Sequence, residues 1–403
     1  MNQVSLSDVY WFQEGPGVRN WQFKESGIKL LNVANITKQG KINLDKTDRH
    51  LSTEEVDSKY QHFLIDEGDL VIASSGITND EDNLLRTKIA FIEKQHLPLC
   101  LNTSTIRFKA KDGVSDLKFL KHWLNSLEFR QQITKEVTGI AQKNFGPSHL
   151  KKIKISLPPL AEQRRIASIL DQADELRQKR QQAIEKLDQL LQAEFISKFH
   201  QKNFPEFNVS DLLENEKSMR TGPFGSQLLH SEFVDEGIHV LGIDNAVQNS
   251  FNWAKPRFIT EEKYKDLKRY TVKPRDVIIT IMGTCGKCAV VPEDIPTAIN
   301  TKHLCCITLD QRKCNPEFLH SYFLLHPTAR NYLESRAKGA IMSGLNMGII
   351  KELPVELPPI EIQNEFSKLK QKVILQKTLM IKELSKLNEL FQSLQNQAFS
   401  GTL

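Results

Sequence analysis

The sequence lacks any apolar run near the roughly 18 to 20 residues that cross a bilayer. Its first residues also lack the basic segment, apolar stretch and cleavage site of a secretory signal. Aromatic residues make up only 8%, but 39% hydrophobic and 26% charged residues are typical of a globular protein with packed cores. We therefore expect a folded, cytoplasmic protein.

Neither sign of charge dominates the chain. Its 54 lysines and arginines nearly balance 49 acidic residues, which leaves a net charge of +5. This balance permits contact with nucleic acid without requiring it. Composition alone therefore does not decide the function.

Cysteine is scarce and unevenly placed. Cys285 and Cys288 form a CxxC pair, but the adjacent Cys305 and Cys306, with His303 nearby, replace the second pair that a zinc site needs. Adjacent side chains of a strand point to opposite faces, and the flanking segments are apolar. The pattern favours buried core strands, and a zinc site is the alternative.

The most informative feature is an internal repeat. Residues 157–163, LPPLAEQ, recur 200 residues later as LPPIEIQ at 357–363. Further pairs follow upstream in the same order: Gly15-Pro16 with Gly222-Pro223, Gly27-Ile28 with Gly237-Ile238, Lys59-Tyr60 with Lys263-Tyr264, Asp69 with Asp276, Asn102-Thr103 with Asn300-Thr301, and Gly139 with Gly339. The 403 residues are therefore two copies of one module.

Each copy predicts a mixed domain of about 150 residues that ends at the Leu-Pro-Pro, because proline cannot continue a strand ladder. We expect a strand after each Gly-Ile, three further strands, a helical stretch and a last short strand. After the Gly-Ile strand, the three further strands, the helical stretch and the last strand are expected at 69–72, 88–92, 102–108, 116–137 and 153–157 in the first copy. In the second copy they are expected at 276–279, 287–291, 300–309, 316–337 and 353–357.

A long helix is predicted after each Leu-Pro-Pro. Residues 160–199 contain no glycine or proline, and apolar side chains recur every three or four positions there and again up to residue 398. A helix of about 40 residues spans roughly 60 Å, more than a small domain needs, so each helix is the obvious partner of the other. The first carries seven basic and seven acidic residues, a balance that favours protein contacts over phosphate contacts.

Catalytic motifs are missing. An adenine methyltransferase needs a glycine-rich cofactor loop and an Asn/Asp-Pro-Pro-Tyr/Phe motif, and neither occurs. Residues 283–287 contain Gly and Gly-Lys but lack the spacing of a phosphate-binding loop. We therefore expect this chain not to be an enzyme.

In their order and duplication, these motifs resemble the specificity subunit of type I restriction-modification enzymes over essentially the whole chain. The strongest stretches are residues 138–160, 157–180 and 221–228. The resemblance implies an α+β fold with two mixed α/β target-recognition domains in a pseudo-two-fold repeat, separated by two long antiparallel coiled-coil helices. The implied bounds are 1–156 and 201–356 for the domains and 157–200 and 357–403 for the helices.

The resemblance also implies a function. Each target-recognition domain of such a subunit reads one half of a bipartite double-stranded DNA site, without catalysis. The helices set the spacing and dock two modification (methyltransferase) subunits and, through them, restriction (translocase/nuclease) subunits. No cofactor is expected on this chain; S-adenosylmethionine, ATP and Mg are expected on the partner subunits, and no membrane is involved.

Candidate DNA contacts are polar residues in corresponding loops of the two copies, since base readout needs donors and acceptors while Lys and Arg bind phosphates. The alternative is that these residues belong to turns and satisfy local backbone groups. The candidates are Arg19, Asn20, Ser74, Ser75, Arg86, Lys88, Gln142, Lys143, Asn144, Arg220, Ser226, Gln227, Thr284, Lys287 and Lys302, with Arg220 and Lys302 expected to contact phosphates.

Other functions stay open at this point. The chain could be a coiled-coil scaffold whose globular domains bind proteins, the DNA reader of another defence complex, or an enzyme that uses zinc at the Cys/His region.

Overall fold

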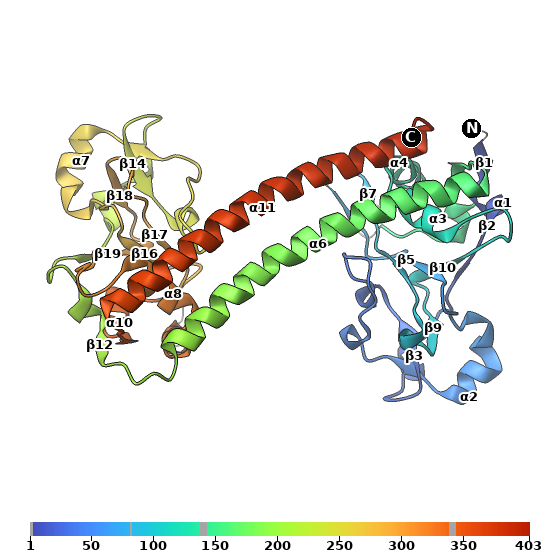
Figure 1. Cartoon of the computed structure of the whole chain (residues 1–403), viewed down its shortest axis with the longest axis horizontal. Coiled ribbons are helices and arrows are strands. Elements are labelled where there is room, and N and C mark those ends of the chain that lie inside the picture. The colour runs from blue at the N-terminus through green and yellow to red at the C-terminus, as the bar shows by residue number, and fades with distance from the viewer. Residues whose placement is uncertain (1–2, 81–82, 138–142, 338–343) are drawn as a thin grey trace. The chain divides into compact units, whose positions relative to one another are not determined.

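The computed structural model describes residues 3–80, 83–137, 143–337 and 344–403. The chain forms two compact units (Figure 1), residues 1–181 with 382–403 and residues 182–381. Each unit therefore contains one mixed domain together with a stretch of both long helices.

The first unit is built on a four-stranded antiparallel sheet in the order β2-β10-β5-β8. A three-stranded sheet, β4-β3-β9, lies beside it and contains the parallel pair β3–β9. The strands are β1 (Gln3–Ser5), β2 (Tyr10–Glu14), β3 (Ile28–Leu31), β4 (His50–Leu51), β5 (Leu70–Ala73), β6 (Thr78–Asn79), β7 (Leu85–Arg86), β8 (Ile89–Phe91), β9 (Leu99–Leu101), β10 (Thr105–Ala110) and β11 (Lys154–Ser156). The helices are α1 (Leu6–Val9), α2 (Thr53–Glu55), α3 (Leu117–Trp123), α4 (Leu127–Glu136) and α5 (Pro147–Leu150).

The second unit repeats this plan with the sheets β13-β19-β16-β17 and β15-β14-β18, and with β12 paired to β20 as β1 pairs to β11. The strands are β12 (Glu206–Asn208), β13 (Met219–Thr221), β14 (Ile238–Leu241), β15 (Phe258–Ile259), β16 (Val277–Thr280), β17 (Cys288–Val290), β18 (Ala298–Asn300), β19 (Leu304–Ile307) and β20 (Pro354–Glu356). The helices are α7 (Glu261–Leu267), α8 (Pro316–Leu325), α9 (Pro327–Ala337) and α10 (Met347–Lys351). The predicted repeat and mixed class are confirmed.

Most predicted elements are present, with differences in the helical stretches and in the strands before them. The stretch 116–137 is two helices, because Ser126 caps α4 by accepting a hydrogen bond from the Phe129 N–H, and 316–337 breaks at His326, before a proline. The strands expected at 102–108 and 300–309 begin only at Thr105 and Leu304. A turn separates each from the strand before it, closed by the Thr105 N–H on the Asn102 carbonyl and by the Leu304 N–H on the Thr301 carbonyl. The strands that were not predicted include β2 and β13, which precede the Gly-Pro turns.

The cysteines of the second domain lie in the predicted strands. Cys288, Cys305 and Cys306 are fully buried. Cys305 packs in one core and Cys306 in another, on opposite faces of β19. Burial raises the pKa of Cys305 to about 12, far from the thiolate that zinc binds. No group of three His, Cys, Asp or Glu suited to a metal occurs among the described residues.

The long helices are α6 (Leu160–Phe199) and α11 (Ile360–Ser400). In the first unit they run antiparallel, with Arg180 paired to Glu383 at 3.0 Å. In the second unit they again run antiparallel, with Lys377 paired to Asp188 at 2.7 Å. The predicted pairing is confirmed within each unit. None of the helices in the described part of the chain is long and apolar enough to span a membrane.

The glutamine of each Leu-Pro-Pro repeat ties a long helix to its domain. Gln163 is fully buried; its side-chain oxygen accepts a hydrogen bond from the Asp116 N–H at 3.0 Å, and its amide donates to the carbonyls of Val114 and Pro158. The same three bonds recur in the second copy, where Gln363 binds Asn315, Lys313 and Pro358. We call each set of three hydrogen bonds a clamp. Each clamp holds the start of the long helix against the start of α3 or α8.

A buried ion pair supports the four-stranded sheet of the first domain. The Asp69 carboxylate, before β5, lies 3.3 Å from the Arg107 guanidinium on β10. Arg107 also donates to the His62 carbonyl at 3.0 Å and to the Gln13 side chain at 2.9 Å. Burial raises the pKa of Asp69 despite this cation. Removal of Arg107 would leave the carboxylate with only the more exposed Lys109, 3.7 Å away, as a charged partner, which is costly for a buried acid.

The second domain builds the same pair from a different strand. Asp276 lies 2.6 Å from Arg220, which stands on β13 rather than β19. In the strand register Arg220 occupies the position of Gln13, and Cys306 occupies that of Arg107. The two copies therefore share the place of the guanidinium and differ in the strand that supplies it.

The variant Gln163→Leu should lower the free energy of unfolding by about 1 to 3 kcal/mol, because it leaves a buried N–H and two carbonyls without partners. Urea unfolding measures this change. Gln172→Leu, at an exposed position of the same helix, is the control and should stay within about 0.5 kcal/mol. Equal losses in both variants would contradict the clamp.

The variant Arg107→Cys should destabilise the first domain by about 2 to 4 kcal/mol, since the buried Asp69 carboxylate loses its closest cation and keeps only the more exposed Lys109. The double variant Gln13→Arg/Arg107→Cys copies the arrangement of the second domain and should recover most of this loss. Thermal unfolding compares the two. A double variant no more stable than Arg107→Cys would show that an arginine on β2 cannot replace one on β10 as the partner of Asp69.

Candidate nucleic-acid interface

The Gly-Pro turns and the Asn-Thr turns meet at one end of each four-stranded sheet. A side chain on Gly15 would collide with the backbone of Asn102, and one on Gly222 would collide with the backbone of Asn300. Only glycine permits so close an approach of two chains. This contact explains why the glycine recurs in the repeat, and it joins the first two candidate loops in both domains.

A third and a fourth loop join this end of the first domain. The Phe145 N–H donates to the Ser74 carbonyl at 2.9 Å, and the Gly76 N–H donates to the Asn144 side chain at 3.3 Å. The Ser74 N–H in turn donates to the Ser104 carbonyl, in the Asn-Thr turn. The structure thus brings candidates from the 74–75 loop and the 143–144 segment together, although about 70 residues separate them in the sequence.

The second domain forms the corresponding cluster. The Ile281 carbonyl accepts from the Leu345 N–H at 2.8 Å, and the Ile281 N–H donates to the His303 carbonyl at 2.9 Å. The loop from 281 to 287, which carries Thr284 and Lys287, therefore lies against the turn that carries Lys302. We call these two sets of loops the loop clusters: residues 15–22, 74–79, 102–104 and 143–145 in the first domain, and 222–227, 281–287, 300–303 and 344–346 in the second.

The candidates differ in exposure. Ser74 is buried, and Gln142 lies outside the described residues. Ser75, Lys88, Lys143 and Lys287 are half-buried. The exposed candidates are Arg19, Asn20, Arg86, Asn144, Ser226, Gln227, Thr284 and Lys302.

Several candidates have side-chain partners inside their own domain. Besides Asn144, Lys143 donates to the Asn79 side chain at 2.9 Å. The Gln227 side-chain oxygen accepts from the Phe224 N–H at 3.1 Å, so it closes a turn, as the alternative for these residues predicts. Lys88 donates to the Val33 carbonyl at 3.3 Å. Arg220, expected to contact phosphate, is instead the buried partner of Asp276, because the sheet needs a cation there. We therefore leave Arg220 out of the proposed interface.

Exposed aromatic side chains in these loops were missed from the sequence. Trp21 is 75% exposed and directly follows Arg19 and Asn20, and Phe224 is 47% exposed after the second Gly-Pro turn. Exposed aromatics beside cations can stack on bases or wedge between them. The signal available in the sequence was a large aromatic residue within an otherwise polar turn.

His303 of the second cluster lies near two cations. Burial lowers the pKa of His303, and the nearby cations of Lys302 and Arg257 lower it further. In the first cluster, burial raises the pKa of Glu14, directly before the Gly-Pro turn.

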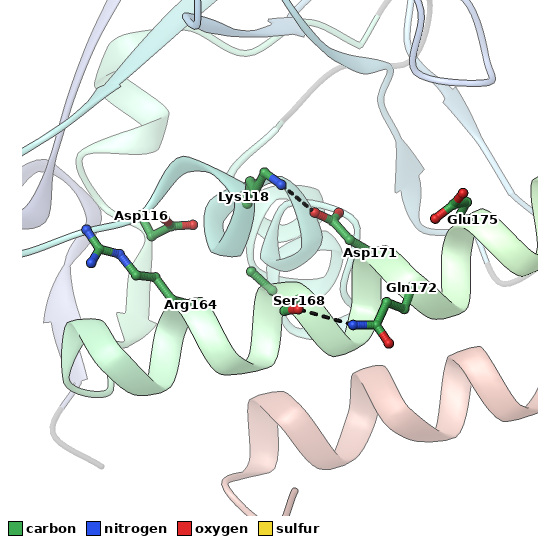
Figure 2. A pocket seen from close by; sticks show the side chains of 8 residues that line it. Asp116, Lys118, Arg164, Ser168, Asp171, Gln172 and Glu175 are labelled. Atoms are coloured by element: carbon green, nitrogen blue, oxygen red, sulfur yellow. Dashed lines mark hydrogen bonds and ion pairs between the residues drawn. The ribbon is translucent and has the colours of Figure 1, made fainter.

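A hollow of about 230 Å³ lies between α3 and α6 of the first unit (Figure 2). Lys118 pairs with Asp171 at 3.1 Å across it, and Ser168 accepts from the Gln172 amide at 3.3 Å. The remaining lining residues are Asp116, Arg164, Ala167 and Glu175. Mixed charges and the lack of a glycine-rich edge make this hollow a poor cradle for a nucleotide.

Comparisons with known proteins agree with this architecture. A family model described as the type I restriction modification DNA specificity domain matches twice, at residues 3–186 and 206–390. The specificity subunit of type I restriction enzyme EcoBI from Escherichia coli is 24% identical over 336 residues, which cover 76% of this chain and 70% of that protein. The MjaVIII specificity subunit from Methanocaldococcus jannaschii is 22% identical over 322 residues, covering 75% and 71%.

Solved structures share the fold. The S subunit of a type I restriction-modification system from M. genitalium matches with a TM-score of 0.54 at 16% identity, covering 99% of this chain and 96% of that one. A chain from a study of complex assembly and conformational transition in the type I R-M system matches with a TM-score of 0.57, also at 16% identity, covering 100% and 98%. With two family matches that together cover most of its length, the chain belongs to the type I restriction-modification DNA specificity subunits, non-catalytic proteins with two target-recognition domains that recognise DNA sequence.

Proposed function

We propose that this subunit reads a bipartite double-stranded DNA site, with each loop cluster contacting one half. The observation that carries the proposal is that both domains build the cluster in the same way, from a Gly-Pro turn packed on an Asn-Thr turn and two further loops. A duplicated reader suits a site with two separated halves, because the spacing of half-sites mirrors that of the reading domains.

The chemistry of the exposed candidates fits this role. Asn20, Asn144 and Thr284 can donate and accept at base edges in the major groove, while Arg19, Arg86 and Lys302 can bind phosphates. Trp21 and Phe224 add exposed rings at matching turns. The loops differ in sequence between the domains, so the two half-sites should differ as well.

The long helices serve, in this proposal, as the spacer and as the docking surface for two modification subunits, with restriction subunits bound through them. Large apolar side chains exposed on both helices support the docking role. They are Leu176 and Leu390 in the first unit and Leu190, Ile374, Leu375, Leu379 and Ile381 in the second. S-adenosylmethionine, ATP and Mg would act on those partners rather than on this chain, within the cytoplasm.

The variant Lys287→Ala should weaken DNA binding by the assembled complex several-fold and lower the slope of log K against log salt by about 1, as the loss of one phosphate contact does. Lys88→Ala should act in the same direction. A salt titration of binding measures both. Lys179→Ala, whose side chain pairs with Glu175 on α6, is the control; unchanged slopes in both loop variants would remove these lysines from the interface.

Replacement of residues 1–156 by the corresponding first domain of a relative should change one half of the recognition sequence and leave the other half intact, because each cluster lies within one domain. Mapping of methylated sites after assembly with modification subunits measures this. Alteration of both halves would refute the modular reading.

A further inference from the structure

The first domain docks on its long helix through an acidic residue of the helix. Asp171 of α6 lies 2.8 Å from His122, 3.1 Å from Lys118 and 3.5 Å from Lys121, all on α3. Burial alone would raise the pKa of Asp171. The hydrogen bonds from His122 and Lys118 outweigh this effect and hold the pKa of Asp171 well below its usual range. At this junction the helix is negative and the domain is positive.

The second domain docks through a basic residue of its helix. Lys370 of α11 lies 2.6 Å from the Glu317 carboxylate of α8 and is almost fully buried. Its ammonium also donates to Nδ1 of His320 at 2.8 Å. Burial lowers the pKa of His320 to about 4, which keeps the ring neutral and able to accept that bond. Here the helix is positive and the domain is negative.

The two junctions lie within one residue of the same place in the repeat. Counted from the clamp glutamines Gln163 and Gln363, Asp171 is equivalent to Gln371, and Lys370 is equivalent to Leu170. Counted from the residues that cap α3 and α8, Lys118 is equivalent to Glu317, and Lys121 to His320. The sign of charge is therefore reversed at the equivalent domain positions Lys118 and Glu317. Their partners on the long helices, Asp171 and Lys370, lie one position apart in the repeat and also carry opposite charge.

The end of the opposite helix adds a second difference. In the first unit, Gln395 of α11 donates to the His122 carbonyl at 3.0 Å. Its equivalent in the second unit is Phe195 of α6, whose ring packs 6.1 Å from that of Phe318. Another contact is shared by both units: Phe399 packs edge-on against Phe119, as Phe199 does against Phe318. The junctions thus have a common aromatic contact and opposite polar ones.

We propose that these residues act as docking keys that admit each target-recognition domain to its own position only. The acidic key is Asp171 with Gln395, which fits the basic face of α3. The basic key is Lys370 with Phe195, which fits the acidic face of α8. The order of the two readers along the chain, and hence the order of the two half-sites, then depends on the helices as well as on the loops.

Electrostatics and hydrogen bonding both act against exchange. A first domain placed in the second position would bring Lys118 and Lys121 against the buried Lys370, with no acid to compensate. Its His122 carbonyl would meet the Phe195 ring and lose its donor. Specificity of this kind arises from mismatches built against the wrong partner as well as from contacts with the right one.

The test compares four full-length chains by thermal unfolding. In the duplicated chain, a second copy of residues 1–156 replaces residues 201–356. The rekeyed chain is the duplicated chain with the triple substitution Phe195→Gln, Lys370→Leu, Gln371→Asp, which gives the second position the key of the first. The other two are the natural chain and the natural chain with the same triple substitution, the matched control.

We expect the triple substitution to raise the melting temperature of the duplicated chain by roughly 5 °C or more, and to lower that of the natural chain by a similar amount. The opposite signs exclude a general effect of the substitutions on helix stability. If the duplicated chain does not fold, the rekeyed chain should still fold. A triple substitution that fails to stabilise the duplicated chain, or two duplicated chains that both fail to fold, would overturn the proposal.

Discussion

The buried side chains of Gln163 and Gln363 fix where each long helix leaves its domain. Each amide satisfies a backbone N–H at the start of α3 or α8 and two carbonyls, one of them in the Leu-Pro-Pro itself. Because a buried unpaired backbone group is costly, a helix cannot turn away from its domain without breaking this set. The docking contacts of Asp171 and Lys370, two turns further along, depend on the direction that the clamps impose.

Charge is divided between the parts of the molecule according to their roles. The buried cations Arg107 and Arg220 support the sheets, and the keys at Asp171 and Lys370 hold the domains on the helices. What remains for DNA is a small set of exposed groups on the loop clusters. A net charge of +5 is therefore compatible with a DNA reader, since binding depends on local patches rather than on the total.

The repeat allowed much of the fold to be predicted. Gly15 and Gly222, the two Leu-Pro-Pro segments and the cysteine strands each have a local pattern with one physical reading. The position of Arg220 does not, because whether an arginine on β13 faces solvent or a buried carboxylate depends on the strand register. Among the site residues, the same limit applies to Gln227, whose side-chain oxygen also accepts a hydrogen bond from the distant Tyr270 at 2.9 Å, and to the exposure of Trp21.

The sequence by itself determined the two modules, their mixed class, the paired long helices and, through the order of its motifs, the family. Periodicity and proline placement are local properties, so they can be recognised in the sequence alone. Only the tertiary structure decided which loops meet at the end of each sheet and which polar residues form hydrogen bonds or ion pairs inside their own domain. It also decided that the two domain–helix junctions have opposite charge, because a key exists only when residues about 50 positions apart, such as Lys118 and Asp171, are brought face to face.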